Sequence, residues 1–378
     1  MQAVILAAGR STRTYPLTIS RPKPLVPLWD RPLLAHQLGQ LEGLVDEVLL
    51  VVGFLKEQIE ERFGDSFGGM RLRYVVQEQQ RGTADALLAA RPLISAPVLV
   101  LNGDDFYHRH DLKGLAERGR GLLVIQASDP QNRAMVTMEG DRITDIVEKP
   151  ENPPRGAWCS VGGYAVQKED LRRLDDVRPS PRRELELPDF VLDLVRSLGV
   201  RAKRIERFWL PITYSWDALA AMLFLWEQPG RARDLGLTAV SEESIRARAD
   251  LVLGKDVTLE GPIRLGRNVT VGDGARLSGP LAIGSGSTLS AQSEVERSVL
   301  FENVYVGADS RVQDSILGEG VRVGSGARLE SRPGSELEID VKGKRVVPEI
   351  GRLGIVAGDG TAIEDRSVVP AGTLLGHS

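Results

Sequence analysis

The sequence predicts two architectures in one chain: an α/β domain with a mostly parallel sheet, followed by a parallel β-helix. Two observations support this prediction. From Met1 to Gln228, short apolar runs alternate with longer segments of helical spacing. From about Leu251 onward, an aliphatic residue recurs every six positions. The change of period marks a change of fold within the chain.

The apolar runs of the first part are continuous rather than alternating, as in strands that are buried on both faces. They predict strands at Ala3–Ala7, Glu47–Val52, Leu72–Gln77 and Val98–Leu101. Helical spacing between them predicts helices at Arg31–Leu44, Lys56–Phe63 and Ala84–Ala90. Strands that alternate with helices favour a parallel sheet, and such sheets bind ligands at the carboxyl ends of their strands.

The six-residue repeat of the second part is typical of a parallel β-helix, in which each hexad forms one strand and one turn. Its aliphatic positions are Leu253, Leu259, Leu265, Val271, Leu277, Ile283, Leu289 and Val295, then Leu300, Val306 and Val312, then Leu317, Val323 and Leu329, and finally Ile363, Val369 and Leu375. The aliphatic residue is expected to fill the core, while Gly, Asp or Asn forms the corner. The repeat shifts by one residue at two places and is interrupted before Ile363.

The predicted boundaries are 1–230 for the α/β domain, 231–250 for a helical connector and 251–378 for the β-helix. A flexible linker is the alternative for 231–250. Gly and Pro are sparse after Gly236, which favours the helical connector.

Composition excludes several classes of protein. The chain has 378 residues, a net charge of −4, 42% hydrophobic and 26% charged residues. These values are ordinary for a globular protein and predict neither nucleic acid nor membrane as a partner. Cys159 is the only cysteine, so no internal disulfide framework exists. No apolar run would span a bilayer, and the N-terminus lacks a signal peptide, so we expect a cytoplasmic protein.

A loop rich in small residues follows the first predicted strand and carries the first candidate site. It reads Leu6-Ala7-Ala8-Gly9-Arg10-Ser11-Thr12-Arg13, and Pro22-Lys23-Pro24-Leu25 follows. Backbone N–H groups in such a loop bind phosphate, and Arg13 and Lys23 add positive charge. The loop matches neither a Walker A loop nor the dinucleotide fingerprint. A simple turn is the alternative, which the two cations make less favoured.

These segments resemble the signature of the sugar-1-phosphate nucleotidylyltransferases, and further motifs match in order. They are Gln77-Glu78-Gln79-Gln80-Arg81-Gly82-Thr83-Ala84, Asn102-Gly103-Asp104, Ile146-Val147-Glu148-Lys149-Pro150 and Trp216-Asp217. The match implies a Rossmann-like nucleotidyltransferase domain. The β-helix tail, expected to be left-handed, is similar to that of archaeal-type bifunctional nucleotidylyltransferase–acetyltransferases. Val341–Val346 and Gly354–Asp359 resemble segments of that tail.

The resemblance implies that a sugar-1-phosphate oxygen attacks the α-phosphorus of a nucleoside triphosphate and that pyrophosphate leaves. The second pKa of a phosphate monoester is about 6, so the nucleophile needs no general base. Positioning and Mg²⁺ would provide the catalysis. The implied catalytic residues are Arg13, Lys23 and Asp104, and the implied Mg²⁺ ligands are Asp104 and Asp217. Arg13 would act on the pyrophosphate and Lys23 on the α-phosphate.

The resemblance also implies substrate contacts. The implied nucleotide-binding residues are Leu6, Ala8, Gly9, Thr12, Arg13, Gln77, Gly82 and Thr83. Among them, Gln77 and Gly82 would read the base, and a Gln amide matches the O4/N3–H edge of uracil or thymine. The implied sugar-phosphate-binding residues are Glu148, Lys149 and Gly162.

Each of these residues has a simpler alternative. In the simpler alternative, Asp104 caps the helix or loop after its strand. Its neighbour Asp105 is an alternative metal ligand. Asp217 would cap a helix that starts at Ala218. Glu148 and Lys149 would be a solvated ion pair. His108 and His110 flank the acidic pair, but a hard cation prefers oxygen ligands.

The sequence departs from the family pattern in places that bear on the substrate. Ser11 stands where a second Gly is usual. Arg133-Ala134 and Ser160-Val161-Gly162 replace Tyr-Gly and Asn-Thr-Gly, which makes N-acetylglucosamine recognition doubtful.

The β-helix also lacks the groups expected for acetyl transfer. The histidines are His36, His108, His110 and His377, so none lies in 251–376, and Ala362 and Arg366 replace an expected Lys and Asn. Without a general base an acetyltransferase loses about 10²–10⁴-fold in rate. We therefore expect the tail to assemble the protein into a trimer or a dimer of trimers.

The leading hypothesis is an Mg²⁺-dependent enzyme that makes a UDP- or dTDP-sugar, with glucose-1-phosphate favoured. The alternatives are an enzyme with an added aminosugar acetyltransferase activity, a mannose-1-phosphate guanylyltransferase, and a non-catalytic regulatory subunit. The sequence leaves the sugar, the base and the oligomer size open.

Overall fold

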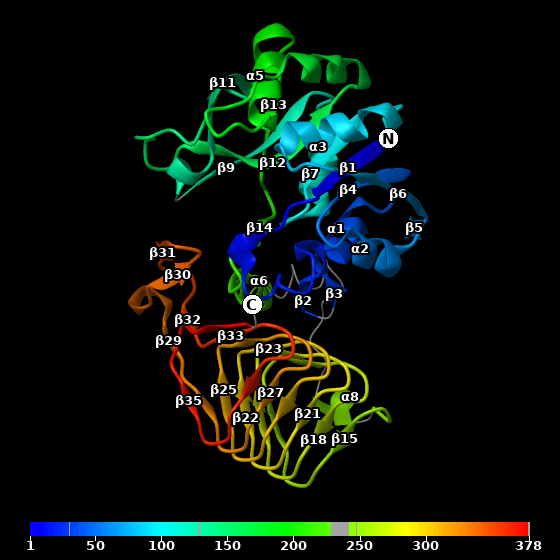
Figure 1. The fold of residues 1–378 in the computed structure, drawn as a ribbon. Coiled ribbons are helices and arrows are strands. Elements are labelled where there is room, and N and C mark those ends of the chain that lie inside the picture. Colours follow the sequence, from blue (N-terminus) through cyan, green and yellow to red (C-terminus); the bar gives the residue numbers. More distant parts are fainter. Residues whose placement is uncertain (30, 128, 228–241, 247, 377–378) are drawn as a thin grey trace. The chain divides into compact units, whose positions relative to one another are not determined.

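The computed structural model describes residues 1–378 except 30, 128, 228–241, 247 and 377–378 (Figure 1). The chain divides into two compact units, which are described separately. The first unit contains Met1–Arg10 and Leu34–Pro211, and the second contains Ser11–Leu33 and Ile212–Ser378. The segment Ser11–Leu33 thus belongs with the C-terminal part of the chain rather than with its sequence neighbours.

The first unit is built on one sheet. Within its described residues the strand order is β10-β11-β13-β9-β12-β7-β1-β4-β6-β5. The strands are β1 Gln2–Ala7, β4 Glu47–Val52, β5 Ser66–Phe67, β6 Met70–Val76, β7 Val98–Asn102, β9 Gly121–Gln126, β10 Ala134–Glu139, β11 Arg142–Glu148, β12 Trp158–Val166 and β13 Arg201–Arg204. β7, β1, β4 and β6 pair in parallel, and these are the four strands that the sequence predicted. Most other pairings are antiparallel, so the whole sheet is mixed.

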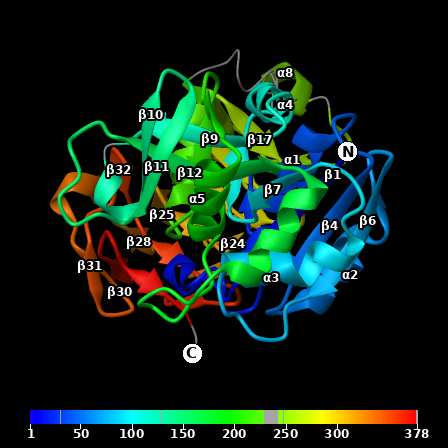
Figure 2. The ribbon, with the colours of Figure 1, turned by 90° about the horizontal axis from the view of Figure 1, so that it is seen from above.

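Helices cover this sheet. They are α1 Leu33–Leu41, α2 Lys56–Phe63, α3 Thr83–Ala90, α4 Arg109–Ala116 and α5 Leu187–Ser197. Two short strands, β8 Asp105–Tyr107 and β14 Trp209–Pro211, form a separate two-stranded sheet. Figure 2 shows α3 lying along β4, and it contacts β1 and β6 as well. Short 3₁₀ turns lie at Arg91–Leu93, Pro130–Asn132 and Lys168–Asp176.

Successive core side chains along the strands of the first unit point to opposite faces of the sheet. Val4, Val98 and Val100 pack with α3 and α5 in one cluster. Ile5 and Leu99, which point to the opposite face, are fully buried too. Burial on both faces explains why the strands read as continuous apolar runs.

The predicted helix at Arg31–Leu44 is too long at both ends. Arg31-Pro32 forms β3 and pairs with β2, Pro27–Leu28, before α1 begins. Pro32 favours extended backbone in the residue before it, and Gly43 has a φ of 70° after the helix. The predictions for α2, α3 and the four parallel strands match the structure to within two residues.

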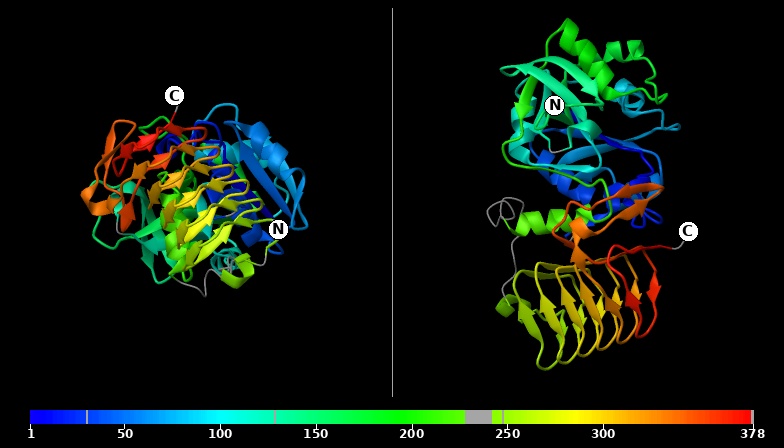
Figure 3. Two further views of the ribbon diagram at one scale, coloured as in Figure 1. Left: turned by 90° about the horizontal axis from the view of Figure 1, so that it is seen from below. Right: turned by 90° about the vertical axis from the view of Figure 1, so that its left-hand side faces the viewer.

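The second unit contains the parallel β-helix, whose strands stack in successive rungs (Figure 3). Its described residues form three parallel sheets, β15-β18-β21-β24-β27-β34, β16-β19-β22-β25-β28-β35 and β17-β20-β23-β26-β33-β36. The strands are β15 Val252–Leu253, β16 Thr258–Glu260, β17 Ile263–Leu265, β18 Thr270–Val271, β19 Arg276–Ser278, β20 Leu281–Ile283, β21 Thr288–Leu289, β22 Glu294–Glu296, β23 Val299–Leu300, β24 Tyr305–Val306, β25 Arg311–Gln313, β26 Ile316–Leu317, β27 Arg322–Val323, β28 Arg328–Leu329, β33 Val356–Ala357, β34 Ala362–Ile363, β35 Val368–Val369 and β36 Leu374–Leu375. The predicted β-helix is confirmed.

The number of residues in each coil of the β-helix explains the shifts of the six-residue repeat. Bonded partners in adjacent coils are 18 residues apart at first and 17 apart further along the chain. Near the end the separation is 40, because an insertion lies between two coils. The insertion contains β29 Arg332–Pro333, β30 Ile339–Val341, β31 Lys344–Val346, β32 Arg352–Leu353 and a 3₁₀ turn at Gly334–Glu336. Corner residues such as Asp256, Asn268 and Asn303 have positive φ, as the Asp and Asn positions predicted.

The remaining elements of the second unit include the two turns that contain the predicted phosphate-binding residues Arg13 and Lys23. The 3₁₀ turns η1 Thr12–Thr14 and η2 Lys23–Leu25 precede β2 and β3, and α6 spans Asp217–Trp226. α8, Glu242–Arg246, lies within the predicted connector 231–250, but residues 231–241 and 247 fall outside the described residues. The boundaries at 230 and 250 stay predictions. None of the helices in the described ranges is long and apolar enough to cross a membrane.

Candidate active site

Loops at the carboxyl edge of the parallel strands form the first part of the site. The amide of Gly103, after β7, donates to the carbonyl of Leu6 at 2.9 Å. The carbonyl of Ala8, after β1, accepts from the Phe54 amide at 3.2 Å and from Gln80 Nε2 at 2.7 Å. The structure therefore brings the predicted nucleotide loop, which includes Leu6, Ala8 and the exposed Gly9, beside the loops that follow the three neighbouring strands.

The two adjacent aspartates of the Asn102-Gly103-Asp104 loop have different environments. Asp105 is buried, and its Oδ2 lies 3.0 Å from Asn102 Nδ2 and 3.0 Å from the Tyr107 hydroxyl. Burial, with both carboxylates nearby, raises the pKa of Tyr107 well above its usual value, so this hydroxyl stays protonated. Asp104 is only partly buried. Asp104 lies in a turn, and the strand β8 follows it rather than a helix, so the alternative that it caps a helix is wrong. The alternative that it caps the loop after β7 stays a prediction.

Gln77 follows β6 and is buried against the start of α3. Its Nε2 donates to the Gly82 carbonyl at 3.2 Å and to Asp85 Oδ2 at 2.8 Å. Both partners are acceptors, which fixes the amide orientation and uses both N–H groups. Gln77 therefore offers a base only its carbonyl oxygen. The predicted pairing of this amide, as both donor and acceptor, with a uracil edge does not fit these bonds.

Gly82 and Thr83 connect α3 to the chain before α5. Gly82 has a φ of 118°, and a Cβ there would lie 2.3 Å from the carbonyl oxygen of Leu185, so only Gly fits. The Thr83 hydroxyl accepts from the Leu187 amide at 3.0 Å. Thr83 thus has a structural bond in addition to its predicted place near the nucleotide.

Glu148 and Lys149 line a cavity of about 530 Å³ in the first unit. Its other lining residues are Arg178, Pro179, Ser180, Pro181, Arg182, Glu186 and Asp189. Arg182 Nη2 contacts Glu148 at 3.2 Å and Glu186 at 2.7 Å, and Lys149 Nζ lies 3.7 Å from Glu148. The hydrogen bonds of Arg182 keep the pKa of Glu186 below its usual value despite burial. The lining therefore combines basic side chains with carboxylates.

The third predicted sugar residue, Gly162, lies at an irregularity of β12 between Ser160 and Tyr164. Its φ is 73°, and a Cβ would lie 2.0 Å from Asn102 Nδ2. Gly162 therefore lets β12 approach the Asn102 side chain, which in turn holds Asp105. The structure places Gly162 at the acidic loop and does not include it in the lining of the Glu148 cavity.

In the second unit, Thr12 and Arg13 lie in η1 and are exposed. Ser11 has a φ of 50°, a conformation that Gly adopts most easily. Ser11 thus adopts a turn in which Gly would be less strained. The Ser11 carbonyl accepts from the Thr14 amide and from the Thr18 hydroxyl, both at 3.0 Å.

Lys23 and Asp217 lie together in the second unit. Lys23 is 3% exposed. Asp217 Oδ2 accepts from the amides of Thr213 at 2.7 Å and Tyr214 at 2.8 Å. Burial raises the pKa of Asp217 to about 6, although these two bonds and the charge of Lys23 oppose the shift. Glu349 of the β-helix insertion raises it further.

The capping alternative for Asp217 is also wrong. α6 begins at Asp217 itself, and the carboxylate accepts from the loop before the helix rather than from the amides of its first turn. The two predicted Mg²⁺ ligands are assigned to different units, Asp104 to the first and Asp217 to the second.

Histidine and clustered ligands do not provide a metal site in the part of the chain that is described. His108 Nδ1 accepts from the His110 amide at 3.0 Å, and His110 Nε2 lies 2.9 Å from Glu206. No group of three or more His, Cys, Asp or Glu side chains is arranged around one point among these residues. Partly buried carboxylates such as Asp104 and Asp217 are suitable ligands for a hard cation that keeps water and phosphate oxygens.

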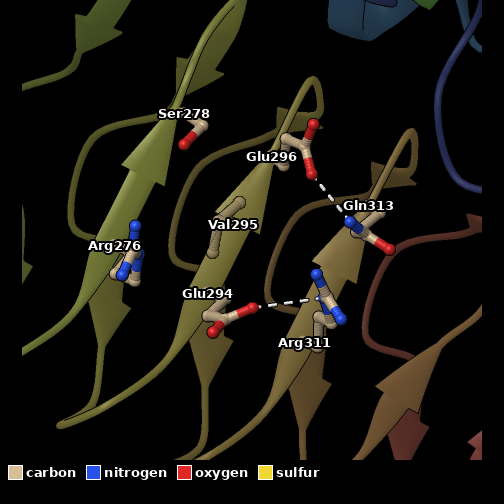
Figure 4. A pocket seen from close by; sticks show the side chains of 7 residues that line it. All are labelled: Arg276, Ser278, Glu294, Val295, Glu296, Arg311 and Gln313. Carbon is tan, nitrogen blue, oxygen red and sulfur yellow. Dashed lines mark hydrogen bonds and ion pairs between the residues drawn. The ribbon is translucent and has the colours of Figure 1, made fainter. Parts of the chain in front are cut away.

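A second hollow, of about 270 Å³, lies on the outer face of the β-helix (Figure 4). Two pairs of its side chains are in contact: Arg311 Nε lies 3.2 Å from Glu294, and Gln313 donates to Glu296 at 2.7 Å.

Sequence reasoning missed the two arginines of the cavity and the exposed Glu349 near Asp217. The signal for Arg178 and Arg182 was a basic, Pro-rich run, Arg178-Pro179-Ser180-Pro181-Arg182-Arg183, in an otherwise unassigned stretch. No local signal identified Glu349, since it is distant from Asp217 in sequence.

Known protein families match both parts of the chain. Residues 2–236 match the family described as Nucleotidyl transferase. The chain belongs to the nucleotidyl transferase family. Residues 259–378 match the GMPPB C-terminal domain, which corresponds to most of the β-helix.

The chain is also similar to individual members of this family. Over 223 residues it is 32% identical to the bifunctional protein GlmU of Methanococcus maripaludis. The aligned region covers 58% of this chain and 53% of the relative. Over 245 residues it is 33% identical to the UTP–glucose-1-phosphate uridylyltransferase AglF of Haloferax volcanii, covering 62% of this chain and 100% of the relative. The match spans about half the length of the GlmU relatives, so their whole activity does not transfer.

A solved structure of UDP-glucose pyrophosphorylase complexed with UDP-glucose has the same fold. The TM-score is 0.54 at 21% identity, covering 60% of this chain and 98% of that one. This likeness concerns the fold alone. Together, these matches confirm the predicted family and its nucleotidyltransferase fold.

Proposed function

We propose that the protein is an Mg²⁺-dependent sugar-1-phosphate nucleotidylyltransferase. It transfers a nucleotidyl group from a nucleoside triphosphate to a sugar-1-phosphate and releases pyrophosphate. UTP or dTTP is the favoured donor and glucose-1-phosphate the favoured acceptor. Family membership supports the reaction class, and the uridylyltransferase AglF is a relative along its whole length.

The observation that carries the proposal is the cavity of Glu148 and Lys149. Sequence resemblance selected these two residues, and the structure surrounds them with Arg178 and Arg182. Cations bind a phosphate, whereas the Glu148 carboxylate accepts hydrogen bonds from sugar hydroxyls. A cavity of about 530 Å³ is within the range of small-molecule sites.

The residues divide the chemistry as follows. Lys149, with the cavity arginines, binds the sugar phosphate, and Glu148 orients the sugar ring. Arg13, exposed on its loop, stabilises the departing pyrophosphate, and Lys23 contacts the α-phosphate. No residue needs to remove a proton, because the phosphate nucleophile is already ionised near neutral pH.

Asp104 and Asp217 would hold Mg²⁺, which would neutralise charge on the triphosphate. Asp104 is favoured over Asp105 because hydrogen bonds from Asn102 and Tyr107 already engage the buried Asp105. The raised pKa of Asp217 fits a carboxylate that a cation would convert to its charged form.

Fewer contacts support the choice of nucleotide base than support the reaction class. Gln77 presents an acceptor, which suits the N3–H of uracil or thymine and equally the N1–H of guanine. The mannose-1-phosphate guanylyltransferase alternative therefore remains open. Because 251–376 contains no histidine, we do not propose acetyl transfer. Assembly through the β-helix into a trimer or a dimer of trimers and a cytoplasmic location belong to the proposal, and light scattering tests the assembly.

Pyrophosphate release with Mg²⁺ tests the reaction. UTP, dTTP, GTP, CTP and ATP are each offered with glucose-, mannose-, galactose- and N-acetylglucosamine-1-phosphate. We expect release that requires both substrates and the metal, and that falls about 10²–10³-fold in Asp104→Ala. Asp176→Asn, which changes an exposed carboxylate of the same unit, is the matched control. The absence of release from the folded wild-type protein with every pair would contradict the proposal and favour a regulatory subunit.

A further inference from the structure

The segment Ser11–Leu33, which carries Arg13 and Lys23, packs against one corner of the β-helix. Both belong to the second unit. The corner consists of the residues that directly follow the strands of the sheet β17-β20-β23-β26-β33-β36, and we call it the corner column. Its members are Gly266, Gly284, Phe301, Gly318, Gly358 and Gly376. Phe301 is the exception among glycines.

Arg21 makes the central contact. Its Nε and Nη2 donate to Asp359 Oδ2 at 3.1 and 2.7 Å, and its Nη2 lies 3.0 Å from Glu319. The guanidinium lies 5.2 Å from the centroid of the Phe301 ring. Asp359 and Glu319 each follow a glycine of the corner column, so Arg21 spans three neighbouring coils. The single aromatic residue of the column thus lies where a cation covers it.

This ion pair is not an ordinary surface contact. The side chains of Arg21 and Asp359 are 14% and 18% exposed. The Ser20 hydroxyl donates to the same Asp359 oxygen. A largely buried pair with several charge-assisted bonds holds a fixed geometry, and loss of one partner leaves a charge without compensation.

Close packing on the same corner provides a second, independent observation. A Cβ on Gly358 would lie 3.0 Å from the Pro16 carbonyl oxygen, and a Cβ on Gly376 would lie 2.7 Å from Pro16 Cβ. Neither glycine has a positive φ, so the missing side chain makes room for the segment rather than for a turn. The Tyr15 hydroxyl contacts the Gly376 carbonyl, and Lys342 Nζ lies 4.9 Å from the Tyr15 ring centroid.

We propose that Asp359 is a positioning residue for nucleotidyl transfer, which acts through Arg21 to hold the segment that carries Lys23 and Arg13. Arg21 is followed by Pro22, whose restricted φ leads directly into η2 at Lys23. A shift at Arg21 is therefore transmitted to Lys23 over a short, stiff stretch. The inference rests on the proposed function, because it assigns the β-helix a role in that same reaction.

Asp359→Asn tests this role with little disturbance of the β-helix. Asp359 Oδ1 accepts from the Glu319 amide at 2.8 Å, and an Asn carbonyl keeps that bond. Oδ2, the acceptor for Arg21 and Ser20, becomes an NH₂ group. This group cannot accept from the Arg21 guanidinium, whereas the Ser20 hydroxyl can turn to accept from it. Asp365→Asn is the matched control, since Asp365 Oδ1 accepts from the Ser325 amide at 2.7 Å in an equivalent turn.

The first measurement does not need activity. We expect faster backbone hydrogen exchange over residues 11–33 in Asp359→Asn than in wild type, and no change in Asp365→Asn. Equal exchange in all three proteins would overturn the anchoring. Lack of pyrophosphate release from wild type would instead contradict the proposed function, and with it the positioning role, while the exchange result still decides whether Asp359 anchors the segment.

The second measurement separates positioning from stability. We expect kcat/KM for the triphosphate to fall about tenfold in Asp359→Asn, with the KM for the sugar phosphate unchanged, because displaced groups lose transition-state contacts. Arg21→Gln should cause a similar loss, and adding Asp359→Asn to it should cost no more. Additive losses, or a kcat/KM equal to that of Asp365→Asn, would overturn the positioning role.

Discussion

We propose that Lys23 and Lys149 both contact substrate phosphates, yet the two units hold them in different ways. Lys23 is 3% exposed and follows a segment that is packed on the β-helix. The Lys149 side chain is 45% exposed and lines a cavity with two arginines of the same charge. A buried cation is preorganised and has few substitutes, whereas exposed cations of one cavity share their task. The repetitive fold thus supplies a rigid support, and the mixed sheet supplies an adaptable pocket.

Removal of each lysine charge gives the largest expected difference between the units. We expect Lys23→Met to lower kcat about 10²–10³-fold, because it removes the buried positive charge that is fixed beside Asp217. Lys149→Met should raise the KM for sugar-1-phosphate only about tenfold, because Arg178 and Arg182 remain. Steady-state kinetics with both substrates varied measures both effects. Equal losses in the two variants would contradict the contrast.

Asp217→Asn probes the buried charge next to Lys23. We expect about 10²-fold lower activity, since a proposed Mg²⁺ ligand loses its charge. The folded pKa of Asp217, about 6, lies above its ordinary value of 3.8. Its protonated form therefore contributes stability that is complete below 3.8 and is lost as the pH rises through about 6.

Thermal unfolding of both proteins from pH 4 to pH 8 measures this effect. Between pH 4 and pH values above 6, the free energy of unfolding of Asp217→Asn should rise relative to that of wild type by about 1–3 kcal/mol. A stability difference that does not change with pH would show that Asp217 has no raised pKa.

Arg182→Gln sharpens the description of the adaptable pocket. Arg182 bridges Glu148 and Glu186, so its loss should leave Glu148 paired with Lys149 and remove one cation from the cavity. We expect the KM for sugar-1-phosphate to rise about three- to tenfold, with the KM for the triphosphate unchanged. Arg183→Gln, which changes the neighbouring exposed arginine, is the control. A change in the triphosphate KM alone would place Arg182 outside the sugar site.

Thr83→Val should have the smallest effect on activity. It removes the hydroxyl that accepts the Leu187 amide but keeps the shape of the side chain. Chemical denaturation should show a loss of about 1 kcal/mol in unfolding free energy, with kcat/KM within about twofold of wild type. A tenfold rise in the triphosphate KM would instead assign Thr83 to the nucleotide.

Periodicity determined much of this protein from sequence. Continuous apolar runs identified β1, β4, β6 and β7, since burial on both faces leaves a local mark. The hexads identified the β-helix for the same reason, because each turn of the coil repeats one local requirement. The motifs also selected Glu148 and Lys149, which the structure places in one cavity.

Tertiary structure alone decided how the selected residues are supported. Arg21 and Asp359 are 338 residues apart in sequence, and no period connects them. The hydrogen bonds of Asp105 and of the Gln77 amide join residues only 2 to 8 positions apart, yet no period of the sequence shows them, because they depend on how each side chain is turned in the fold. The one visible trace of the Arg21 contact in the sequence was Phe301 in a column of glycines. Local patterns report backbone and burial, whereas side-chain pairing between distant segments depends on how the whole chain packs.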